Sequence, residues 1–437
     1  MPERLLVVAD QLPYPPRNGS TLPLVNYLDQ LGRTYELLLL LLREADRPFD
    51  AAERADNERL IGPLLEATVV RRGRVRRIVD ELRGRGLYQH GWRAGDTRAL
   101  SALAEREPAW RTAPVLATPL SALARWQAVR AALPGWQPRR TVVVVHDCTA
   151  AEYRWRWRSP QAGVLGRAKA WSHWLRAPRV AQAEAALLSA ADCVLVQTAA
   201  DREAMRRLVG PATAARTALA PNGVRAGLLE LAAGPSPAPQ VLFVAELSGE
   251  YGPVAEWLCR GVWPRVRAAV PEARLTVVGR GAGPALRRCL AGTPGAEHLE
   301  FAADLAPLYA GSRVVWSPLW KGFGLINKTL EAMAAARPVV GGLAAFNGIT
   351  GFVDGVHGRG LAHPDPLAMA DATAELLRDA PRAAAMGAAA RELVRDGFRW
   401  ERTAERLREA LAGAAPGPAH APLLSGAGAR AAAGLGR

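Results

Sequence analysis

The chain has few cysteines, few lysines and no long apolar run. Its four cysteines, Cys148, Cys193, Cys259 and Cys289, contain no CxxC pair, which argues against a disulfide framework and a zinc site and favours a reducing, cytoplasmic compartment. No apolar run approaches the roughly 20 residues of a membrane-spanning helix. The longest, Leu37–Leu42, predicts a buried strand. Lysine supplies three of the 56 basic residues.

Length and charge set wider limits. A chain of 437 residues predicts two or three domains, and a hydrophobic fraction of 49% excludes a fibrous or wholly disordered protein. The net charge of +15 would attract nucleic acid, anionic lipid or a phosphorylated substrate. The excess of arginine with abundant alanine and glycine indicates high-GC codon pressure. Because no nucleic-acid-binding motif accompanies the bases, we expect no nucleic-acid partner.

Short apolar runs alternate with helical stretches, which is typical of parallel α/β units. In the first half, strands are expected at Leu5–Ala9, Tyr35–Leu42, Thr68–Val70, Thr141–Val145 and Cys193–Gln197. In the second half, they are expected at Val241–Ala245, Arg274–Val278, Leu299–Phe301, Val314–Ser317 and Pro338–Gly341.

The Pro- and Gly-rich segment 232–239 separates these two series and predicts a linker. The sequence therefore predicts two Rossmann-like α/β domains, residues 1–231 and residues 240–397. Residues 413–437 contain few large apolar side chains, so we expect a disordered tail there.

Ligands of open parallel sheets bind beyond the carboxyl ends of the strands. After the first strand, Asn18 and Gly19 let the backbone turn tightly and approach a ligand before Ser20 or Thr21 caps a helix. An ordinary strand-to-helix turn is the alternative interpretation of this loop.

A second loop follows the expected strand Val314–Ser317. Gly322 and Gly324 remove side chains where backbone amides would reach an anion, and the next helix adds its positive end. This combination suits a diphosphate.

Lys328 and Glu331 are three residues apart and are expected on one face of that helix. The carboxylate suits ribose hydroxyls, and the ammonium suits a phosphate. A solvated ion pair worth about 0.3 to 0.5 kcal/mol is the alternative. Lys321 and Lys328 are two of the chain's three lysines, which favours a retained point charge in this segment.

This segment carries a resemblance to a known family. Ten residues match the pattern P-L-x-x-G-x-G-x-x-x-K-x-L-E-A-M-A in register: Pro318, Leu319, Gly322, Gly324, Lys328, Leu330, Glu331, Ala332, Met333 and Ala334. The chain resembles glycosyltransferases of the GT-B fold, in the family 4 (group 1) set of retaining, nucleotide-sugar-dependent enzymes. The resemblance implies two Rossmann-like domains with a cleft between them.

Weaker motifs agree in order along the chain. They are Pro13–Pro16 with Gly19, Asp192–Thr198 with Asp201, Pro221–Val224, Val277–Gly281 and Phe398–Trp400. The last resembles the start of the family's closing helix, expected here at 398–412, which returns to the amino-terminal domain.

Several positions depart from the family pattern. Phe323 stands where the commoner pattern has a glutamate that contacts the donor sugar. Alanine stands at two expected glycines, at Ala245 and at Ala302 or Ala303, and Trp320 replaces an arginine for which Lys321 is a substitute. These departures raise the alternatives of an altered donor or a weakened enzyme.

The resemblance implies a donor site on the second domain. Glu331 would bind the ribose, and the diphosphate would lie at the amides of Gly322, Phe323 and Gly324. Lys328, Lys321 and Arg280 would assist it. Fixed dipoles and cations stabilise a leaving diphosphate without a metal, so we expect neither a metal nor a cofactor.

The acceptor would lie near Asn18 and Gly19, facing His146 and Asp147 at the end of the strand Thr141–Val145. His146 would hydrogen-bond a sugar or acceptor hydroxyl, and Asp147 would orient it or accept a proton. A purely structural histidine at a strand end is the alternative.

Two basic stretches bear on the acceptor. Arg71–Arg85 holds seven arginines, and Tyr153–Ala183 holds seven bases, no acid and four tryptophans, Trp155, Trp157, Trp171 and Trp174. Bases with interleaved tryptophan suit an anionic membrane surface, which favours a lipid-linked or membrane-presented acceptor and a peripheral position at the inner membrane face. In the alternative interpretation the tryptophans pack on the sheet and the arginines are solvated.

Three functions remain open. The favoured one is transfer of a sugar from a nucleotide sugar to a hydroxyl acceptor, with retention, in cell-surface polysaccharide, glycolipid or natural-product biosynthesis. The alternatives are a GT-B-fold nucleotide-sugar epimerase and a non-catalytic nucleotide-sugar-binding scaffold.

Overall fold

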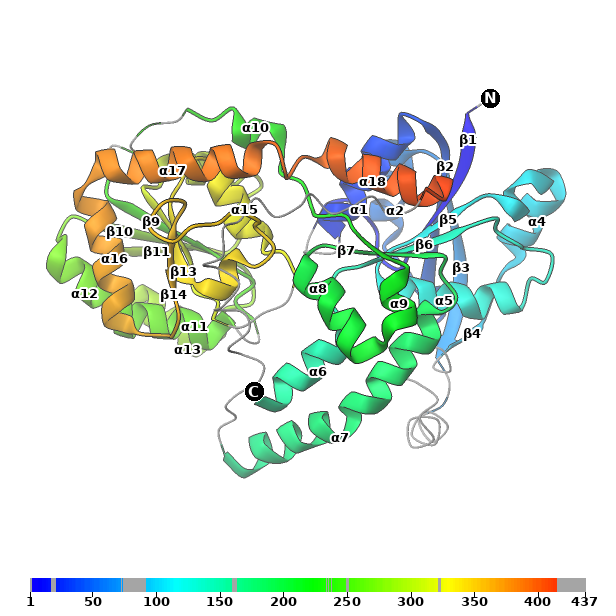
Figure 1. Ribbon diagram of the computed structural model, residues 1–437, viewed down its shortest axis with the longest axis horizontal. Helices are drawn as coiled ribbons and strands as arrows, with labels where there is room; N and C mark the ends of the chain where they lie inside the picture. The colour runs from blue at the N-terminus through cyan, green and yellow to red at the C-terminus, as the bar shows by residue number, and fades with distance from the viewer. Residues whose placement is uncertain are drawn as a thin grey trace. The chain divides into compact units, whose positions relative to one another are not determined.

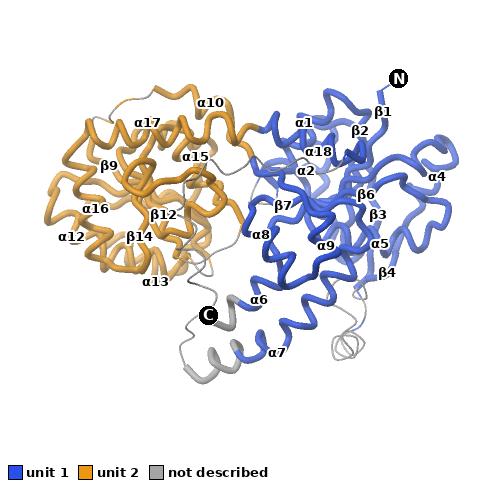
Figure 2. Tube along the Cα trace, in the orientation of Figure 1, with its two compact units in different colours: residues 1–222, 400–419 blue, residues 223–399, 420–437 orange. Residues whose placement is uncertain are grey.

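The structure is a computed structural model that describes most of the chain in two compact units (Figures 1 and 2). Unit 1 comprises Met1–Asn222 with Trp400–Ala419, and unit 2 comprises Gly223–Arg399 with His420–Arg437. The described residues are 2–16, 21–71, 73, 92–158, 163–232, 234, 236, 238–248, 251–320 and 324–414, with the side chains of 155–158 and 163–170 left out. The expected tail therefore lies almost entirely outside the described residues.

Unit 1 is built on an eight-stranded sheet of order β4-β3-β2-β1-β5-β6-β7-β8. All its strand pairs are parallel except β3 with β4, which is antiparallel. The strands are β1 (Glu3–Ala9), β2 (Tyr35–Glu44), β3 (Leu64–Arg71), β4 (Trp92–Ala94), β5 (Val115–Ala117), β6 (Thr141–Val145), β7 (Cys193–Val196) and β8 (Thr217–Leu219).

Helices surround this sheet. They are α1 (Thr21–Gly32), α2 (Ala51–Ile61), α4 (Arg98–Arg106), η1 (Pro108–Thr112), α5 (Leu120–Ala131), α6 (Thr149–Arg158), α7 (Gly163–Leu188), α8 (Ala199–Ala204), η2 (Met205–Val209), α9 (Pro211–Ala215) and α18 (Trp400–Ala412). Local sequence sets several starts: Thr198 and Asp201 form a reciprocal capping box before α8, and Asp50 caps α2.

Unit 2 is built on a six-stranded parallel sheet of order β11-β10-β9-β12-β13-β14. The strands are β9 (Gln240–Val244), β10 (Arg274–Val278), β11 (Ala296–Leu299), β12 (Val314–Ser317), β13 (Val339–Gly342) and β14 (Arg359–Leu361). The helices are α10 (Ala226–Leu229), α11 (Tyr251–Trp257), η3 (Leu258–Val262), α12 (Trp263–Ala269), α13 (Pro284–Ala291), α14 (Ala306–Gly311), α15 (Asn327–Ala334), η4 (Leu343–Phe346), α16 (Pro366–Arg378) and α17 (Ala380–Arg395).

The central strands are mostly apolar because helices cover both faces of each sheet. In unit 1, Leu5–Ala9 of β1 and Val142–Val145 of β6 are buried. Helix α18 follows unit 2 in the sequence but packs in the core of unit 1, where Trp400 meets Tyr27 edge-on with ring centroids 6.0 Å apart.

The segment 232–239 is tied to unit 2 where it is described. The Ser236 hydroxyl donates to the Gly311 carbonyl oxygen over 2.7 Å, and the Arg337 guanidinium donates to the Gly234 carbonyl oxygen over 2.7 Å. The two units divide between Asn222 and Gly223. No helix among the described residues has the length and apolar character needed to cross a bilayer.

Most of the predicted strands are present, three of them with the predicted bounds. The prediction for Leu299–Phe301 is wrong beyond its first residue, because the strand is Ala296–Leu299 and Phe301 is 61% exposed. Cys193–Gln197 and Val241–Ala245 each end one residue earlier than predicted.

Candidate functional site

The loop between β12 and α15 is held at both ends. The Ser317 and Thr329 hydroxyls are hydrogen-bonded over 2.8 Å, which ties the end of β12 to the first turn of α15. Gly324 has φ of 73°, a left-handed conformation that favours glycine. Lys321, Gly322 and Phe323 lie outside the described residues, so their predicted donor contacts stay predictions.

Glu331 is the centre of a buried polar cluster on α15. Glu331 is 6% exposed. Its Oε2 accepts hydrogen bonds from Lys328 Nζ and from the Tyr309 hydroxyl, both over 3.0 Å. The Lys328 side chain is 40% exposed. The alternative of a fully solvated surface pair is therefore wrong for the carboxylate, which is buried while its lysine partner reaches solvent.

Tyr309 comes from α14 and is completely buried. Burial, with the negative charge of Glu331, raises the pKa of Tyr309 well above its ordinary value. The phenol therefore stays protonated and acts only as a donor to Glu331. Nothing in the local sequence marked this residue, because it lies 22 positions before the carboxylate that it meets.

Arg280 follows β10, and β10 and β12 both run parallel to β9 and flank it. Arg280 therefore lies at the edge of the sheet where the loop between β12 and α15 begins. Its guanidinium lies 4.2 Å from the centroid of the Phe301 ring. Stacking of this kind orients a guanidinium while leaving its N–H groups at the ring edge.

The alanines at expected glycines fit the backbone. Among the described residues, Ala336 is the one non-glycine with positive φ, so Ala245, Ala302 and Ala303 adopt conformations open to any residue. Gly279 makes a close approach at this edge, where an added Cβ would lie 1.8 Å from the Ala245 carbonyl oxygen.

Unit 1 gathers polar residues at the carboxyl ends of neighbouring strands. Thr118, His146 and Gln197 directly follow β5, β6 and β7. Asn222 comes three residues after β8. Since these four strands are adjacent and parallel, the side chains meet at one edge. His146 was among the predicted site residues, whereas Thr118, Gln197 and Asn222 were not, although their places after strands were a usable signal.

The surroundings of His146 fix its protonation. Burial lowers its pKa to about 4, so the ring is neutral at neutral pH. Gln197 Nε2 lies 3.0 Å from His146 Nδ1 and donates to Asn222 Oδ1 over 3.2 Å. An amide nitrogen can only donate, so Nδ1 accepts and the ring proton lies on Nε2, 3.5 Å from the Thr118 hydroxyl. His146 is therefore built as a neutral hydrogen-bond donor.

Asp147 has a different character. Desolvation of its carboxyl group, with the negative charges of Asp201 and Glu152, raises its pKa to about 7, although the residue as a whole is exposed. Asp147 therefore exchanges a proton near neutral pH, as a group that gives or takes a proton requires.

The predicted acceptor residues Asn18 and Gly19 lie outside the described residues. The part of the same loop that is described is clamped by Asn57 of α2, which is fully buried. Asn57 accepts from the Tyr14 N–H and donates to the Tyr14 carbonyl oxygen, both over 2.8 Å. Nothing in the local sequence indicated this long-range contact.

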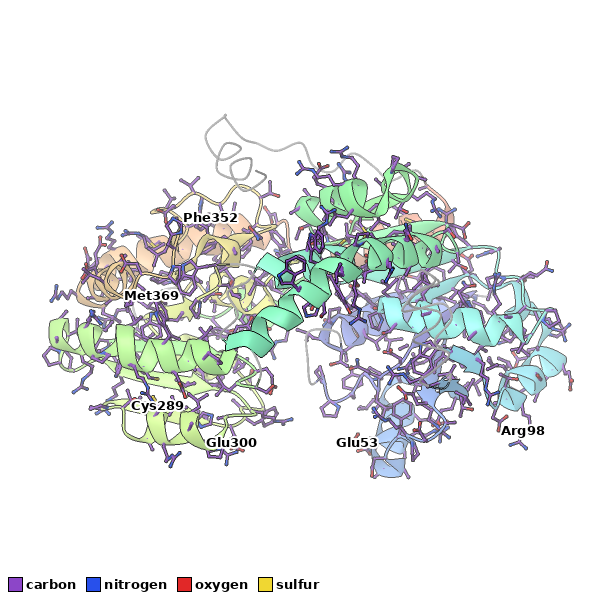
Figure 3. The ribbon with its side chains drawn as sticks, turned by 90° about the horizontal axis from the view of Figure 1, so that it is seen from below. Glu53, Arg98, Cys289, Glu300, Phe352 and Met369 are labelled. Atoms are coloured by element: carbon purple, nitrogen blue, oxygen red, sulfur yellow. The ribbon has the colours of Figure 1, made fainter. Side chains whose placement is uncertain are left out.

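Unit 2 also has a groove of about 670 Å³, which is not lined by the predicted donor residues. Its lining includes Cys259, Trp263 and Cys289, the last labelled in Figure 3, and none of the predicted donor residues. Within the described part of the chain, no three His, Cys, Asp or Glu side chains gather as a metal site.

Comparison with known families gives a match in unit 2. Residues 238–379 match the family model described as "Glycosyl transferases group 1". This range contains every predicted donor residue. The resemblance to group 1 glycosyltransferases predicted from the motifs is confirmed in this part of the chain.

Two mycobacterial proteins are similar over a shorter range. The GDP-mannose-dependent alpha-(1-6)-phosphatidylinositol monomannoside mannosyltransferase of Mycolicibacterium smegmatis is 33% identical over 166 residues, covering 34% of this chain and 42% of that protein. The protein of the same name from Mycobacterium tuberculosis H37Rv is 35% identical over 170 residues, with the same coverage. The chain thus matches less than half the length of these curated relatives.

Solved structures are similar over nearly the whole chain. Anabaena HepE in complex with UDP and glucose has a TM-score of 0.65 at 17% identity, covering 94% of this chain and 100% of that one. Sucrose-phosphate synthase from Thermosynechococcus elongatus has a TM-score of 0.60 at 18% identity, covering 93% of this chain and 98% of that one. The predicted fold class, two Rossmann-like domains of the GT-B type, is confirmed.

Proposed function

We propose that this chain is a nucleotide-sugar-dependent glycosyltransferase that moves a sugar to a hydroxyl acceptor with retention. The observation that carries the proposal is the buried Glu331, held by Lys328 and Tyr309 behind the left-handed Gly324, within the range that matches the group 1 family. A carboxylate, an ammonium and a glycine turn at a helix start are the groups that a ribose and a diphosphate require.

In this proposal Glu331 accepts hydrogen bonds from the ribose hydroxyls. Because two donors converge on Oε2, we assign the ribose hydroxyls to Oε1. Lys328 and Arg280 neutralise the diphosphate, whose negative charge grows as the sugar leaves, and the amides of Gly322, Phe323 and Gly324 add fixed dipoles. Lys321 supplies a further positive charge beside them.

The edge of unit 1 supplies groups for hydroxyls. His146 donates from Nε2 to a sugar or acceptor hydroxyl, and its neutrality through the physiological range keeps this role independent of pH. Asp147, with a pKa of about 7, orients the acceptor or takes its proton. Asn18 and Gly19 bring backbone groups to the same acceptor.

We propose a lipid-linked acceptor and a cytoplasmic protein that works at the inner membrane face. Support comes from the two mycobacterial relatives, whose names specify a phosphatidylinositol monomannoside, and from the basic, tryptophan-containing stretch Tyr153–Ala183. Those names also make GDP-mannose the first donor to test, whereas HepE was solved with UDP and glucose.

The backbone at the departures favours an active enzyme over a scaffold. Ala245, Ala302 and Ala303 need no glycine conformation, so these substitutions leave the sheet edge unstrained. Phe323 changes the contact to the donor sugar, and we therefore expect an altered sugar preference.

A donor screen tests the proposal directly. The purified chain is incubated with UDP-, GDP- and dTDP-sugars, with and without lipid and soluble hydroxyl acceptors, and products are read by mass spectrometry. Release of nucleotide with a glycosylated acceptor supports transfer. A changed sugar with donor alone indicates an epimerase, and binding of nucleotides without any turnover indicates a scaffold.

A further inference from the structure

Helix α7 carries an apolar stripe on the outside of unit 1. Trp171 is 55% exposed, Trp174 47% and Leu175 58%. Positions i, i+3 and i+4 lie on one side of a helix, and the two indole rings form a T-shaped pair with centroids 5.4 Å apart. We call these three side chains the α7 stripe. In Figure 2, α7 lies beside α6 at the margin of unit 1.

The opposite side of α7 accounts for its packing. Ala177, Val180 and Leu187 are buried at 5%, 0% and 0%. Nearer the stripe, His173 and Arg176 both face Tyr153 of α6, with ring centroids 5.1 Å apart and the guanidinium 5.6 Å from the ring. The helix is thus anchored by one side, and the interpretation in which its tryptophans pack on the sheet is wrong for Trp171 and Trp174.

The stripe is unusual within this molecule. No other tryptophan whose side chain is described is exposed. The other exposed large apolar residues of the described chain are widely spaced in sequence, apart from Val353 and Val356, and none is a tryptophan. A cluster of exposed apolar side chains on a protein surface marks an interaction site.

The charge around the stripe selects the partner. Tyr153–Ala183 contains seven bases and no acid, and Arg179, one turn beyond Leu175, is exposed. The nearest acid on α7, Glu184, is buried and accepts hydrogen bonds from the Thr149 and Ala150 N–H groups. A second copy of the chain would bring another base-rich, acid-free stretch to the stripe, so it offers no opposite charge. An anionic lipid surface offers headgroup charge to the arginines and an interface that indole rings favour.

We infer that the α7 stripe with Arg179 is a docking surface for an anionic lipid bilayer. This inference rests on the proposed function, because it names the surface that brings unit 1 to a lipid-linked acceptor. Docking needs no turnover, so binding and catalysis are measured separately.

The test uses the full chain and sucrose-loaded vesicles of phosphatidylcholine with and without phosphatidylglycerol. We expect sedimentation with the anionic vesicles that weakens in high salt. The combined change Trp171→Ser, Trp174→Ser and Leu175→Ser should lower the partition coefficient by about tenfold or more. Arg179→Gln should lower it about fivefold on anionic vesicles only.

The matched control is Leu60→Ser with Leu367→Ser, which removes apolar side chains 61% and 56% exposed on α2 and α16. It should bind vesicles as the unchanged chain does. Equal binding of the stripe variant and the unchanged chain would overturn the inference. The inference would also be overturned if light scattering showed that the unchanged chain is a dimer and the stripe variant a monomer. A third contrary result would be vesicle binding that duplex DNA abolishes and that does not depend on the lipid composition.

Donor hydrolysis and transfer to a water-soluble acceptor separate the two proposals. A stripe variant that keeps turnover on soluble substrates but loses vesicle binding supports docking. An unchanged chain that binds anionic vesicles through the stripe but transfers no sugar contradicts the proposed function alone.

Discussion

At the scale of residues, the Glu331 cluster makes the strongest prediction. Lys328→Ala and Glu331→Ala should each lower kcat/KM about a hundredfold or more, because each removes a charged group that the leaving diphosphate or the ribose needs. Tyr309→Phe keeps the ring packing and removes one hydrogen bond, so it should raise the donor Kd about fivefold.

Steady-state kinetics and donor titration, with circular dichroism as a check of folding, measure these effects. The matched control is Arg260→Ala, which removes a basic side chain of unit 2 that lies outside the Glu331 cluster. Unchanged kinetics in both Lys328→Ala and Glu331→Ala would refute the assigned donor site.

The contact between Gln197 and His146 predicts that a change at Gln197 alters the pH dependence of turnover. A carboxylate in Gln197→Glu would draw the ring proton to Nδ1 and stabilise the charged ring, raising the pKa of His146 from about 4 towards neutral. Turnover should then fall and gain a new pH dependence between about pH 5 and 8.

The measurement is a pH profile of kcat for Gln197→Glu beside Gln182→Glu, which places the same charge on an exposed part of α7. If the two profiles have the same shape, Gln197 does not position His146.

Residues of the site differ in how far sequence alone could find them. Glu331, Lys328 and Gly324 form a compact motif, so their neighbourhood was predictable. Tyr309 and Asn57 meet partners 22 and 43 positions away, and such contacts exist only after the sheets assemble. Gln197 lies between these cases, because its place after a strand was visible while its partners were not.

At the scale of elements, the same limit appears. Long β-branched or leucine runs predicted β1, β2 and β6 well. Strands β4, β5, β8 and β14 have three residues each, too few to show a period, and none was predicted. In β11 the apolar Phe301 suggested a strand, but this ring lies outside the strand under Arg280.

The junction of α6 with α7 predicts a pH effect on stability. Glu184 of α7 accepts from the Thr149 and Ala150 N–H groups over 3.0 and 2.9 Å, satisfying the first turn of α6. Burial raises its pKa from 4.5 to about 7. Because the folded state holds this proton more tightly, its contribution to stability is complete below pH 4.5 and is lost as the pH rises towards 7.

Glu184→Gln removes the ionisable group and keeps an acceptor oxygen. We expect the melting temperature of this variant to fall less between pH 5 and pH 8 than that of the unchanged chain. Glu405→Gln, an exposed glutamate on α18, is the control and should keep the original pH dependence. Equal slopes for all three proteins would contradict the role assigned to Glu184.

At the scale of the whole molecule, the chain leaves unit 1 after Asn222, builds unit 2 and returns with α18 to complete unit 1. Each unit has its own core, and the core of unit 1 includes Trp400, Leu407 and Leu411 from α18. The integrity of unit 1 therefore depends on a helix that is separated from Asn222 by the 177 residues of Gly223–Arg399, which build unit 2.

This connection predicts the effect of truncation. A chain ending at Arg399 loses three large buried side chains and the hydrogen bond from the Thr403 hydroxyl to the Pro221 carbonyl oxygen. At about 2 to 5 kcal/mol for each large buried side chain, the loss rivals a whole domain's stability of about 5 to 15 kcal/mol. Unit 1 should unfold while unit 2 keeps its core.

A chain ending at Ala414 retains all of α18 and is the matched control. Limited proteolysis with mass spectrometry should find fragments of unit 2 alone in the shorter chain and both units protected in the control; equal protection of unit 1 in the two chains would show that its core folds without α18.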